Sequence, residues 1–216
     1  MTRKEQQERR LEEMTRLERE FWDAGRLRVA GMDEVGRGPL AGPVVGACVI
    51  LPPDDLILGI NDSKKLSPAR REALAAQIHA RALFVGIGQV EPQQIDEMNI
   101  LNATKKALLA ACTWQEAPDF LLFDTVPGLR PPCPARGLVK GDALSYSIAA
   151  ASIVAKVYRD GLMQKYDRQY PQYGFARNKG YGTAEHMEAL RRYGPCPIHR
   201  RSFITRILQE ADDAGE

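Results

Sequence analysis

Cysteine is scarce in this 216-residue sequence, and its four occurrences are widely scattered. No Cys-x-x-Cys pair is present, so the sequence supports neither a disulfide framework nor a structural zinc site. Cys196 and His199 have the spacing of metal ligands, but two such groups make at most half of a site. We therefore interpret that pair as unrelated residues.

Long apolar runs and a strong charge of one sign are missing as well. No run approaches the length of about 20 residues that spans a bilayer. The N-terminal residues are highly charged and include no apolar export segment. These absences predict a cytoplasmic protein with no membrane partner. The formal net charge of +2 does not by itself imply nucleic acid, so any bound phosphate must meet locally arranged cations.

The remaining composition, 44% hydrophobic and 27% charged, is that of a globular protein with one core domain. Residues 3–24 alternate Arg, Lys and Glu, while apolar residues recur three and four apart. This spacing predicts one amphipathic helix with a narrow apolar stripe, formed by Leu11, Met14, Leu17, Phe21 and Trp22. We interpret this helix as a packing or partner-binding appendage, with a solvated terminal helix as the alternative.

The core domain shows alternating strand and helix signals. Apolar segments typical of strands are residues 27–35, 44–51, 82–90 and 120–123. The first two are joined by a short loop and are expected to pair antiparallel. Helices are expected at residues 68–80, 99–111, 145–166 and 184–193, with a short one near the C-terminal end. Ser67 and Thr183 are the expected N-caps, and Gly194 is expected to end its helix.

Four carboxylates occupy comparable positions in these elements. Asp33 and Glu34 close the first strand, Asp124 follows another strand, and Asp142 precedes a long helix. Such acids can converge at one sheet edge, and an oxygen cluster without His or Cys suits Mg2+ or Mn2+. Neighbouring strand residues point to opposite faces, so Asp33 and Glu34 share a metal only if the strand bends or one uses its carbonyl. Taken singly, each acid is more typical of a turn or cap.

A glycine loop, Gly36-Arg37-Gly38, follows the first two acids. Glycines let a backbone approach a ligand closely, and successive N–H groups can cradle phosphate oxygens. The alternative is an ordinary turn in which Glu34 and Arg37 form a surface ion pair. Further candidate anion contacts precede an expected helix or lie in cationic loops: Lys64, Lys65, Lys140, Arg177, Lys179, Arg200 and Arg201.

Tyr181 lies between two glycines, where its ring can stack on a sugar or base. A core tyrosine between turn glycines is the alternative. His79 and His186 fall in expected helices, and we interpret both as packing or surface residues.

Several separate motifs occur in one order along residues 27–207. They are AGMDEVGRGPLAGPVV at 30–45, NDSKKLS at 61–67, KGD at 140–142, IAAASIVAK at 148–156 with RD at 159–160, YP and YGF between 170 and 175, KGYGT at 179–183 and HRRSF at 199–203. Together they resemble bacterial ribonuclease HII. The family usually has Gly-Asn after its third acid, whereas Thr125 and Val126 follow Asp124 here, which leaves that loop's conformation open.

The resemblance implies an α/β, ribonuclease H-like fold with a mixed central sheet flanked by helices, plus a C-terminal helical region that binds substrate. Residues 1–26 are then an N-terminal helical extension, and residues 27–216 are the catalytic domain. The implied activity hydrolyses the RNA strand of RNA–DNA hybrids and nicks 5′ of single ribonucleotides in duplex DNA, leaving 5′-phosphomonoesters. Ribonucleotide removal and RNA primer removal are the implied roles, and a monomer is expected.

The resemblance also implies residue roles. The catalytic, metal-binding acids are Asp33, Glu34, Asp124 and Asp142, with Mn2+ or Mg2+ as cofactor. The loop that recognises the junction between a ribonucleotide and the next deoxynucleotide is Gly36, Arg37 and Gly38. Tyr181 is the stacking residue, and Lys64 and Lys65 are added as substrate contacts.

Two other functions compete with this one. A non-enzymatic hybrid-binding protein would use the cationic loops without cleaving, but four convergent acids would repel phosphate unless metal were bound. A phosphotransferase built on the glycine loop is disfavoured because the sequence lacks a Gly-x-x-x-x-Gly-Lys-Ser/Thr pattern.

Overall fold

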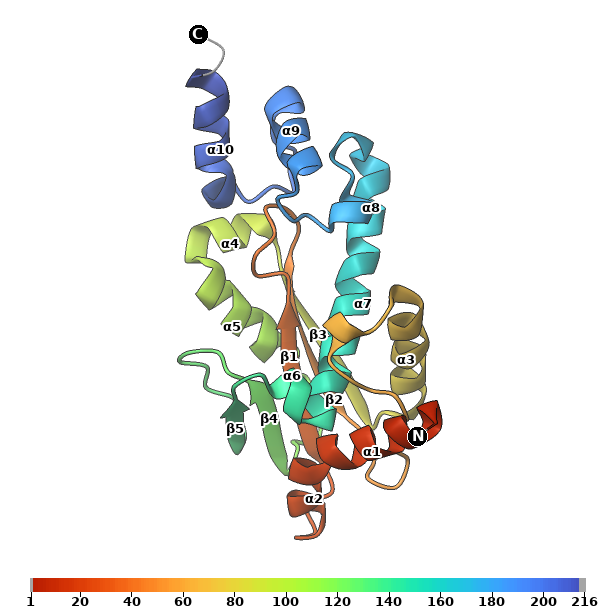
Figure 1. Ribbon diagram of the computed structural model, residues 1–216. Helices are drawn as coiled ribbons and strands as arrows, with labels where there is room; N and C mark the ends of the chain where they lie inside the picture. The colour runs from red at the N-terminus through yellow and green to blue at the C-terminus, as the bar shows by residue number, and fades with distance from the viewer. Residues whose placement is uncertain (1, 214–216) are drawn as a thin grey trace.

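The computed structural model describes residues 2–213, in which helices cover both faces of a central sheet and extend beyond it (Figure 1). The strands are β1 Val29–Val35, β2 Val44–Ile50, β3 Phe84–Val90, β4 Phe120–Asp124 and β5 Ala135–Leu138. The α-helices are α1 Arg3–Met14, α2 Arg16–Trp22, α3 Pro68–Arg81, α4 Pro92–Met98, α5 Ile100–Ala110, α6 Gly141–Leu144, α7 Tyr146–Gln169, α8 Phe175–Asn178, α9 Ala184–Tyr193 and α10 Arg201–Asp213. The 3-10 turns are η1 Ser63–Lys65 and η2 Pro171–Tyr173.

The sheet is mixed and has the strand order β3-β2-β1-β4-β5. β1 pairs antiparallel with β2, as the short loop between them predicts, and β2 pairs antiparallel with β3. β4 runs parallel to β1, and β5 runs parallel to β4. The register aligns Met32 with Phe123, so the next residue on each of these strands is an acid, Asp33 or Asp124. The predicted mixed sheet flanked by helices is confirmed.

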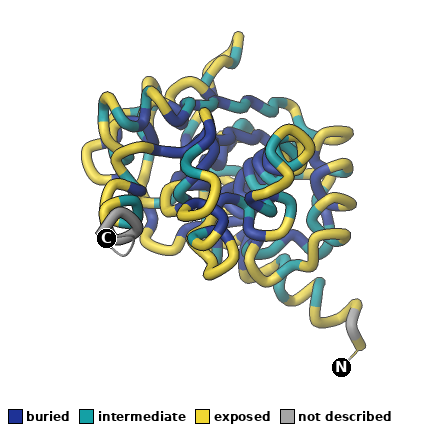
Figure 2. Tube along the Cα trace, turned by 90° about the horizontal axis from the view of Figure 1, so that it is seen from above, coloured by how far each residue is buried: buried dark blue, intermediate teal, exposed yellow. Residues whose placement is uncertain are grey.

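The two faces of the sheet are covered by different helices. On one face, Val45 and Val49 of β2 belong to the same core as residues of α3 and α7, among them Ala150 of α7. On the opposite face, Ile50 packs against Leu108 of α5. Figure 2 shows that buried segments gather in the interior and that exposed segments surround them. Alternate side chains of β2 therefore serve two cores, which is why this strand is apolar throughout.

Helix α7 lies directly on β1 because the sequence places small residues at their contact. A Cβ atom at Gly31 would lie 1.9 Å from the carbonyl carbon of Ser147, so only glycine fits there. The run Ala149, Ala150 and Ala151 is fully buried. This close approach holds the start of α7 beside the end of the strand that carries Asp33.

The N-terminal segment differs from the predicted single helix at residues 3–24. It forms two helices separated by Thr15, which is fully buried and whose hydroxyl donates to the Leu11 carbonyl at 2.9 Å. A buried threonine that bonds back into the preceding turn favours such a bend. Met14 is 1% exposed and belongs to the core beside α3 and α7. The extension is therefore packed against the sheet domain rather than solvated.

The C-terminal helices form a region beyond the end of the sheet, at the top of Figure 1. Met163 from the second half of α7 packs with Phe175 of α8, Leu190 of α9 and Ile204 of α10. The predicted C-terminal helical region is confirmed. Helix α9 begins at the predicted cap, where the Thr183 hydroxyl accepts from the His186 amide.

The sequence did not foresee β5, α4, the four-residue helices α6 and α8, or the 3-10 turns η1 and η2. β5 is only four residues long, contains Arg and Gly, and follows a proline-rich run, so its strand character depends on pairing with β4. α4 is a seven-residue helix whose buried residues are Pro92 and Ile95, too few to show a helical period. No helix among residues 2–213 combines the length and apolarity needed to cross a membrane.

Candidate active site

The acids at the strand ends come together where β1 and β4 leave the sheet. Asp33 is 6% exposed, and the Ser152 hydroxyl of α7 bonds to its carboxylate. Asp124 accepts from the Thr125 amide at 2.9 Å and from the Gly141 amide at 3.3 Å. The second bond ties the end of β4 to the segment that carries Asp142, so this fold links acids from three separate parts of the chain.

Burial and mutual repulsion make these carboxyl groups hard to ionise. The pKa of Asp33 is raised well above its ordinary value, first by burial and then by the charges of Glu34 and Asp124. The pKa of Glu34 is also raised, mainly by burial, although the nearby Arg37 charge opposes this shift. A bound cation would lower the pKa of both groups because it stabilises their ionised forms.

Asp142 completes the group and has a cationic partner. It is 6% exposed, and Lys64 Nζ donates to its carboxylate at 3.2 Å. Burial alone would lower the pKa of Lys64, but the charge of Asp142 and their hydrogen bond raise it instead. The charge of Asp33 makes a smaller contribution that also raises the pKa of Lys64.

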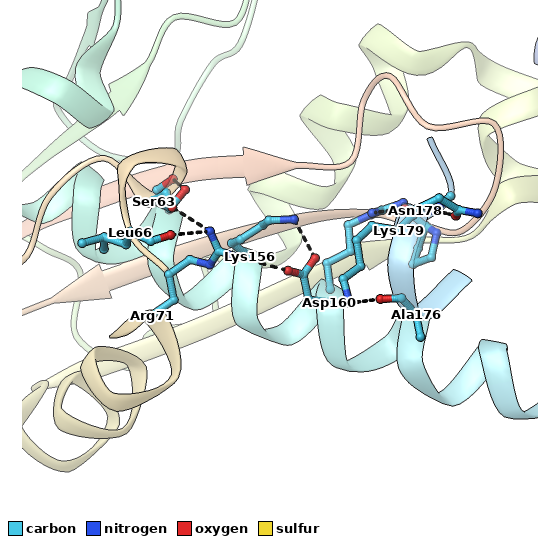
Figure 3. A network of polar contacts seen from close by, with 12 residues as sticks. Ser63, Leu66, Arg71, Lys156, Asp160, Ala176, Asn178 and Lys179 are labelled. Atoms are coloured by element: carbon cyan, nitrogen blue, oxygen red, sulfur yellow. Dashed lines mark hydrogen bonds and ion pairs between the residues drawn. The ribbon is translucent and has the colours of Figure 1, made fainter. Parts of the chain in front are cut away.

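A network along α7 fixes the turn that presents Lys64. In Figure 3, Asp160 lies between Lys156 and Arg71, and Arg71 also donates to the carbonyl oxygens of Ser63 and Leu66 at 2.9 and 3.0 Å. The turn is thus anchored on both sides of the two lysines. Lys65 is exposed and lines a separate groove with Arg10 and Arg70.

The Glu34–Arg37 ion pair of the alternative interpretation does form, at 3.3 Å. However, the Glu34 side chain is only 12% exposed, so the pair is not an ordinary surface pair. The Arg37 side chain is 43% exposed, so its guanidinium contacts Glu34 and is also open to solvent.

The glycine loop and Tyr181 are neighbours, although they are far apart in the sequence. The Leu40 and Ala41 amides donate to the Gly180 carbonyl at 2.8 and 3.3 Å. A Cβ atom at Gly38 would lie 3.8 Å from the Tyr181 ring, and that ring is 44% exposed. Tyr181 is therefore a half-exposed ring beside the loop rather than a core residue.

The donor set suits a hard divalent cation, because oxygen ligands from carboxylates are what Mg2+ and Mn2+ bind. The fit is supported by the two acids whose burial and repulsion favour a nearby positive charge. As they stand, no three His, Cys, Asp or Glu side chains between residues 2 and 213 are grouped closely enough to hold a metal ion. Lys64 Nζ supplies the positive charge beside Asp142 in this arrangement.

Comparisons with known proteins agree with this geometry. A family model for ribonuclease HII matches residues 30–119 and 135–206. Ribonuclease HII of Geobacillus kaustophilus is 55% identical over 208 residues, which cover 95% of this chain and 80% of that protein. Ribonuclease HII of Caldanaerobacter subterraneus is 52% identical over 206 residues, covering 95% of this chain and 86% of that protein. The crystal structure of ribonuclease H2 from Pyrococcus horikoshii is similar, with a TM-score of 0.73 and 27% identity over 86% of this chain and 99% of that one.

The chain belongs to the ribonuclease HII family. Ribonucleases HII are divalent-metal-dependent, type 2 ribonucleases H, which cleave RNA in RNA–DNA hybrids and at ribonucleotides embedded in DNA. The resemblance seen in the sequence motifs, and the hydrolytic activity that it implies, are confirmed at this level.

Asp124 is the candidate ligand that the ribonuclease HII family model does not cover. It lies between the two matched segments, in the region where Thr125 and Val126 depart from the family's usual residues. In the structure the Thr125 amide also donates to the Leu138 carbonyl at 3.0 Å, and Val126 is 3% exposed in the core. The departure therefore extends the contact between β4 and β5 and leaves Asp124 at the end of its strand.

Two interpretations of the sequence were wrong. Arg200, taken as an anion contact, is fully buried and donates to backbone carbonyls of the glycine loop. Cys196 and His199, taken as unrelated, are in contact, with Sγ 3.1 Å from Nδ1. His199 Nε2 in turn lies 3.0 Å from Nε2 of His186, whose assignment as a packing residue agrees with its complete burial.

Sequence reasoning missed Ser63, Ser152 and Arg159 near the ribonuclease HII site. The two serine hydroxyls bond each other at 2.9 Å, and Ser152 also bonds Asp33. Arg159 is fully buried and donates to the Ala41 and Pro43 carbonyls at 3.0 and 2.9 Å. The sequence marked these three residues only by placing them inside the motifs that resemble ribonuclease HII. Without the motifs, a polar residue in such a segment is typical of an exposed position.

Proposed function

We propose that Asp33, Glu34, Asp124 and Asp142 hold the divalent ions of this ribonuclease HII, with Mg2+ and Mn2+ both suited to the oxygen donors. The observation that carries this proposal is the buried Asp33, whose carboxyl group faces the charges of both Glu34 and Asp124. When bound, such ions lower the pKa of an attacking water and stabilise the leaving 3′-oxygen.

The chain's own residues have distinct roles in this proposal. Ser152 orients Asp33, and the Gly141 amide orients Asp124. Lys64 holds positive charge at Asp142, and its exposed side chain would also reach substrate phosphates. Lys65 is an outer phosphate contact, since its side chain is exposed.

Substrate recognition is proposed for the surface formed by Gly36, Arg37, Gly38 and Tyr181. The glycines allow close approach of the backbone to the ribose, whose 2′-hydroxyl distinguishes RNA from DNA. Tyr181 stacks on the sugar or base beside the cut. The nick then falls 5′ of the ribonucleotide and leaves a 5′-phosphomonoester.

The remaining parts of the proposal concern the whole chain. Residues 1–26 act as a helical extension of the catalytic domain at 27–216, and the chain acts as a cytoplasmic monomer. Removal of single ribonucleotides and of RNA primers are the proposed roles, because both need a cut at an RNA–DNA junction.

The decisive experiment is cleavage of a duplex that contains one ribonucleotide, with Mn2+, with Mg2+ and with EDTA. Metal-dependent nicking on the 5′ side of the ribonucleotide is expected, with mapping of the product ends as the measurement. Cleavage that persists in EDTA, or a nick elsewhere, would contradict the proposal.

A second experiment tests the loop through Arg37→Ala. Loss of the guanidinium should lower cleavage at a single ribonucleotide by about tenfold relative to a continuous RNA–DNA hybrid, as expected for one lost charged hydrogen bond. The measured quantity is the ratio of kcat/KM for the two substrates. An unchanged ratio would remove the glycine loop from junction recognition.

A further inference from the structure

Arg200 is a buried cation that bonds the glycine loop from behind. Its side chain is fully buried, and its guanidinium donates to the carbonyl oxygens of Gly36 at 2.6 Å, Arg37 at 2.9 Å and Gly42 at 2.8 and 3.0 Å. Its own backbone amide donates to the Leu40 carbonyl at 2.9 Å. One residue of the segment before α10 thus holds both ends of the loop.

These bonds determine where the loop amides point. In a trans peptide unit the C=O and the following N–H point in opposite directions. Because Arg200 holds the Gly36 and Arg37 carbonyls inward, the N–H groups of Arg37 and Gly38 point away from the protein core. Within residues 2–213, no protein acceptor is seen for either of these amides, whereas the Leu40 and Ala41 amides both bond the Gly180 carbonyl.

The charge of Arg200 reinforces this orientation. Across the described part of the chain, no ion pair involves this guanidinium, and the Phe203 ring lies 5.2 Å from it. Burial, together with the charge of Arg159, lowers the pKa of Arg200 to about 9. A guanidinium behind aligned peptide dipoles makes the potential at their N–H ends more positive, which favours an oxygen acceptor there.

We infer that Arg200 is a positioning residue for substrate discrimination: it holds the Arg37 and Gly38 amides toward the ribose 2′-oxygen and adjoining phosphate at the RNA–DNA junction. The inference rests on the proposed role of the glycine loop. Arg200 itself does not touch the substrate, because it lies beneath the loop. It acts through the two peptide planes.

Arginine is required because three carbonyls converge on one planar fork of donors. A lysine keeps the charge but has a single ammonium group, which cannot occupy the positions of Nε, Nη1 and Nη2 together. Arg200→Lys therefore separates orientation of the loop from charge.

A matched control exists in Arg159, the other fully buried arginine under this loop. It donates to the Ala41, Pro43 and Lys179 carbonyls, at 3.0, 2.9 and 2.9 Å, and to none in the Gly36–Gly38 segment. Arg159 also packs against Gly36, where a Cβ atom would lie 2.2 Å from its Nε. Arg159→Lys thus perturbs the same loop by loss of a comparable buried fork, while the bonds of Arg200 to the Gly36 and Arg37 carbonyls remain.

The experiment compares both variants on a one-ribonucleotide duplex and on a continuous RNA–DNA hybrid. Arg200→Lys should lower the ratio of kcat/KM on the first substrate to that on the second by about tenfold, whereas Arg159→Lys should change it by less than about twofold. Thermal denaturation of both variants measures any shared loss of stability. Equal ratios in Arg200→Lys and the unmodified chain, or equal losses in both variants, would overturn the inference.

Arg37→Ala separates this inference from the proposed function. If Arg37→Ala lowers the ratio but Arg200→Lys does not, the loop reads the junction without help from Arg200. If neither does, the loop assignment itself is wrong.

Amide exchange in the unmodified full-length chain provides a test that does not depend on variant folding. The Arg37 and Gly38 amides should exchange rapidly, because no protein acceptor holds them, while the Leu40 and Ala41 amides are protected. Protection of the Arg37 and Gly38 amides would overturn the inference.

Discussion

Burial of Asp33 disfavours the ionised carboxylate, which is the form that binds a metal ion. Its carboxyl group is 6% exposed, bonds Ser152 and faces the charges of Glu34 and Asp124. Without a cation, this arrangement favours the neutral acid, as the direction of its pKa shift shows. A residue selected for stability alone would be uncharged there, so the acid is explained by a ligand that the folded chain is built to receive.

Asp33→Asn is therefore expected to abolish activity without loss of stability. Removing one metal ligand should lower the cleavage rate by about 10³-fold or more, since several kcal/mol of charge stabilisation are lost. In EDTA the melting temperature should stay equal or rise, because the asparagine avoids the free-energy cost of protonating this buried acid when the chain folds. Asp54→Asn, at an exposed loop position, is the control and should change neither quantity. Retained cleavage by Asp33→Asn would exclude this acid as a ligand.

At the scale of elements, the contact between β1 and α7 brings the catalytic candidates together. β1 carries Asp33 and Glu34, and α7 carries Ser152 and follows the short helix with Asp142. The two elements approach through Gly31, where a Cβ atom would overlap the backbone of Ser147. The start of α7 can therefore lie this close to β1 only because residue 31 is glycine, which has no side chain.

Gly31→Ala should destabilise the fold by about 3 kcal/mol or more, because the overlap is with helix backbone that cannot move alone. Gly161→Ala, within α7 itself, is the matched control. No atom lies within 4 Å of a Cβ placed there, so it should stabilise the helix by about 0.5–1 kcal/mol. Denaturant unfolding measures both, and an unaffected Gly31→Ala would show that α7 is not held by this contact.

The N-terminal helices also act on the start of α7. Glu18 of α2 is fully buried and accepts from the Ser145 hydroxyl at 2.5 Å and the Ser147 amide at 2.9 Å. Its second carboxylate oxygen is buried without a partner among the described residues. Arg10 of α1 donates to the Ala143 carbonyl at 2.7 Å, so the extension contacts the chain directly after Asp142.

Glu18 predicts a pH-dependent stability. Burial raises its pKa despite the hydrogen bonds from Ser145 and Ser147. A raised folded-state pKa means that its contribution is complete below the unfolded-state pKa and is lost as pH rises through the folded-state value. Glu18→Gln should therefore gain melting temperature relative to the unmodified chain as pH rises from about 4.3, the ordinary glutamate value. Glu20→Gln, exposed on the same helix, should give no such trend.

At the scale of the whole molecule, the site is a junction of three layers. The sheet supplies Asp33 and Asp124, the helical face supplies Ser152 and the segment of Asp142, and the C-terminal region supplies Tyr181 and Arg200. The C-terminal core, in which Phe175 packs against His199, therefore lies beside two residues that we propose to act in substrate recognition. Burial lowers the pKa of His199 to about 4, so this core stays uncharged at neutral pH.

Divalent metal should stabilise the whole chain. Saturation at about 100 times the dissociation constant contributes about 2.7 kcal/mol, provided that the ion binds only the folded state. For a chain of this length, that corresponds to a rise in melting temperature of about 5–10 °C. Calorimetry with and without Mn2+ measures the shift, and Asp33→Asn should lose most of it. An equal shift in both proteins would place the ion elsewhere.

The sequence by itself determined the elements and the family. Continuous apolar runs at β2 and β4, the caps Ser67 and Thr183, and the alanine run of α7 are local signals that hold wherever the chain packs. The motifs around Asp33 and Tyr181 were specific enough to indicate ribonuclease HII. These features depend on residues that are close together in the sequence, so they can be recognised without the tertiary structure.

Only the tertiary structure decided how the parts meet. The bend at Thr15, the pairing of β5 and the contact of Cys196 with His199 depend on partners or packing that local patterns do not display. Arg200 is the clearest case, because an arginine in a cationic run looks like a surface charge. Its burial follows from three carbonyls of a loop more than 150 residues away, so long-range hydrogen bonding, not local sequence, gives it its place.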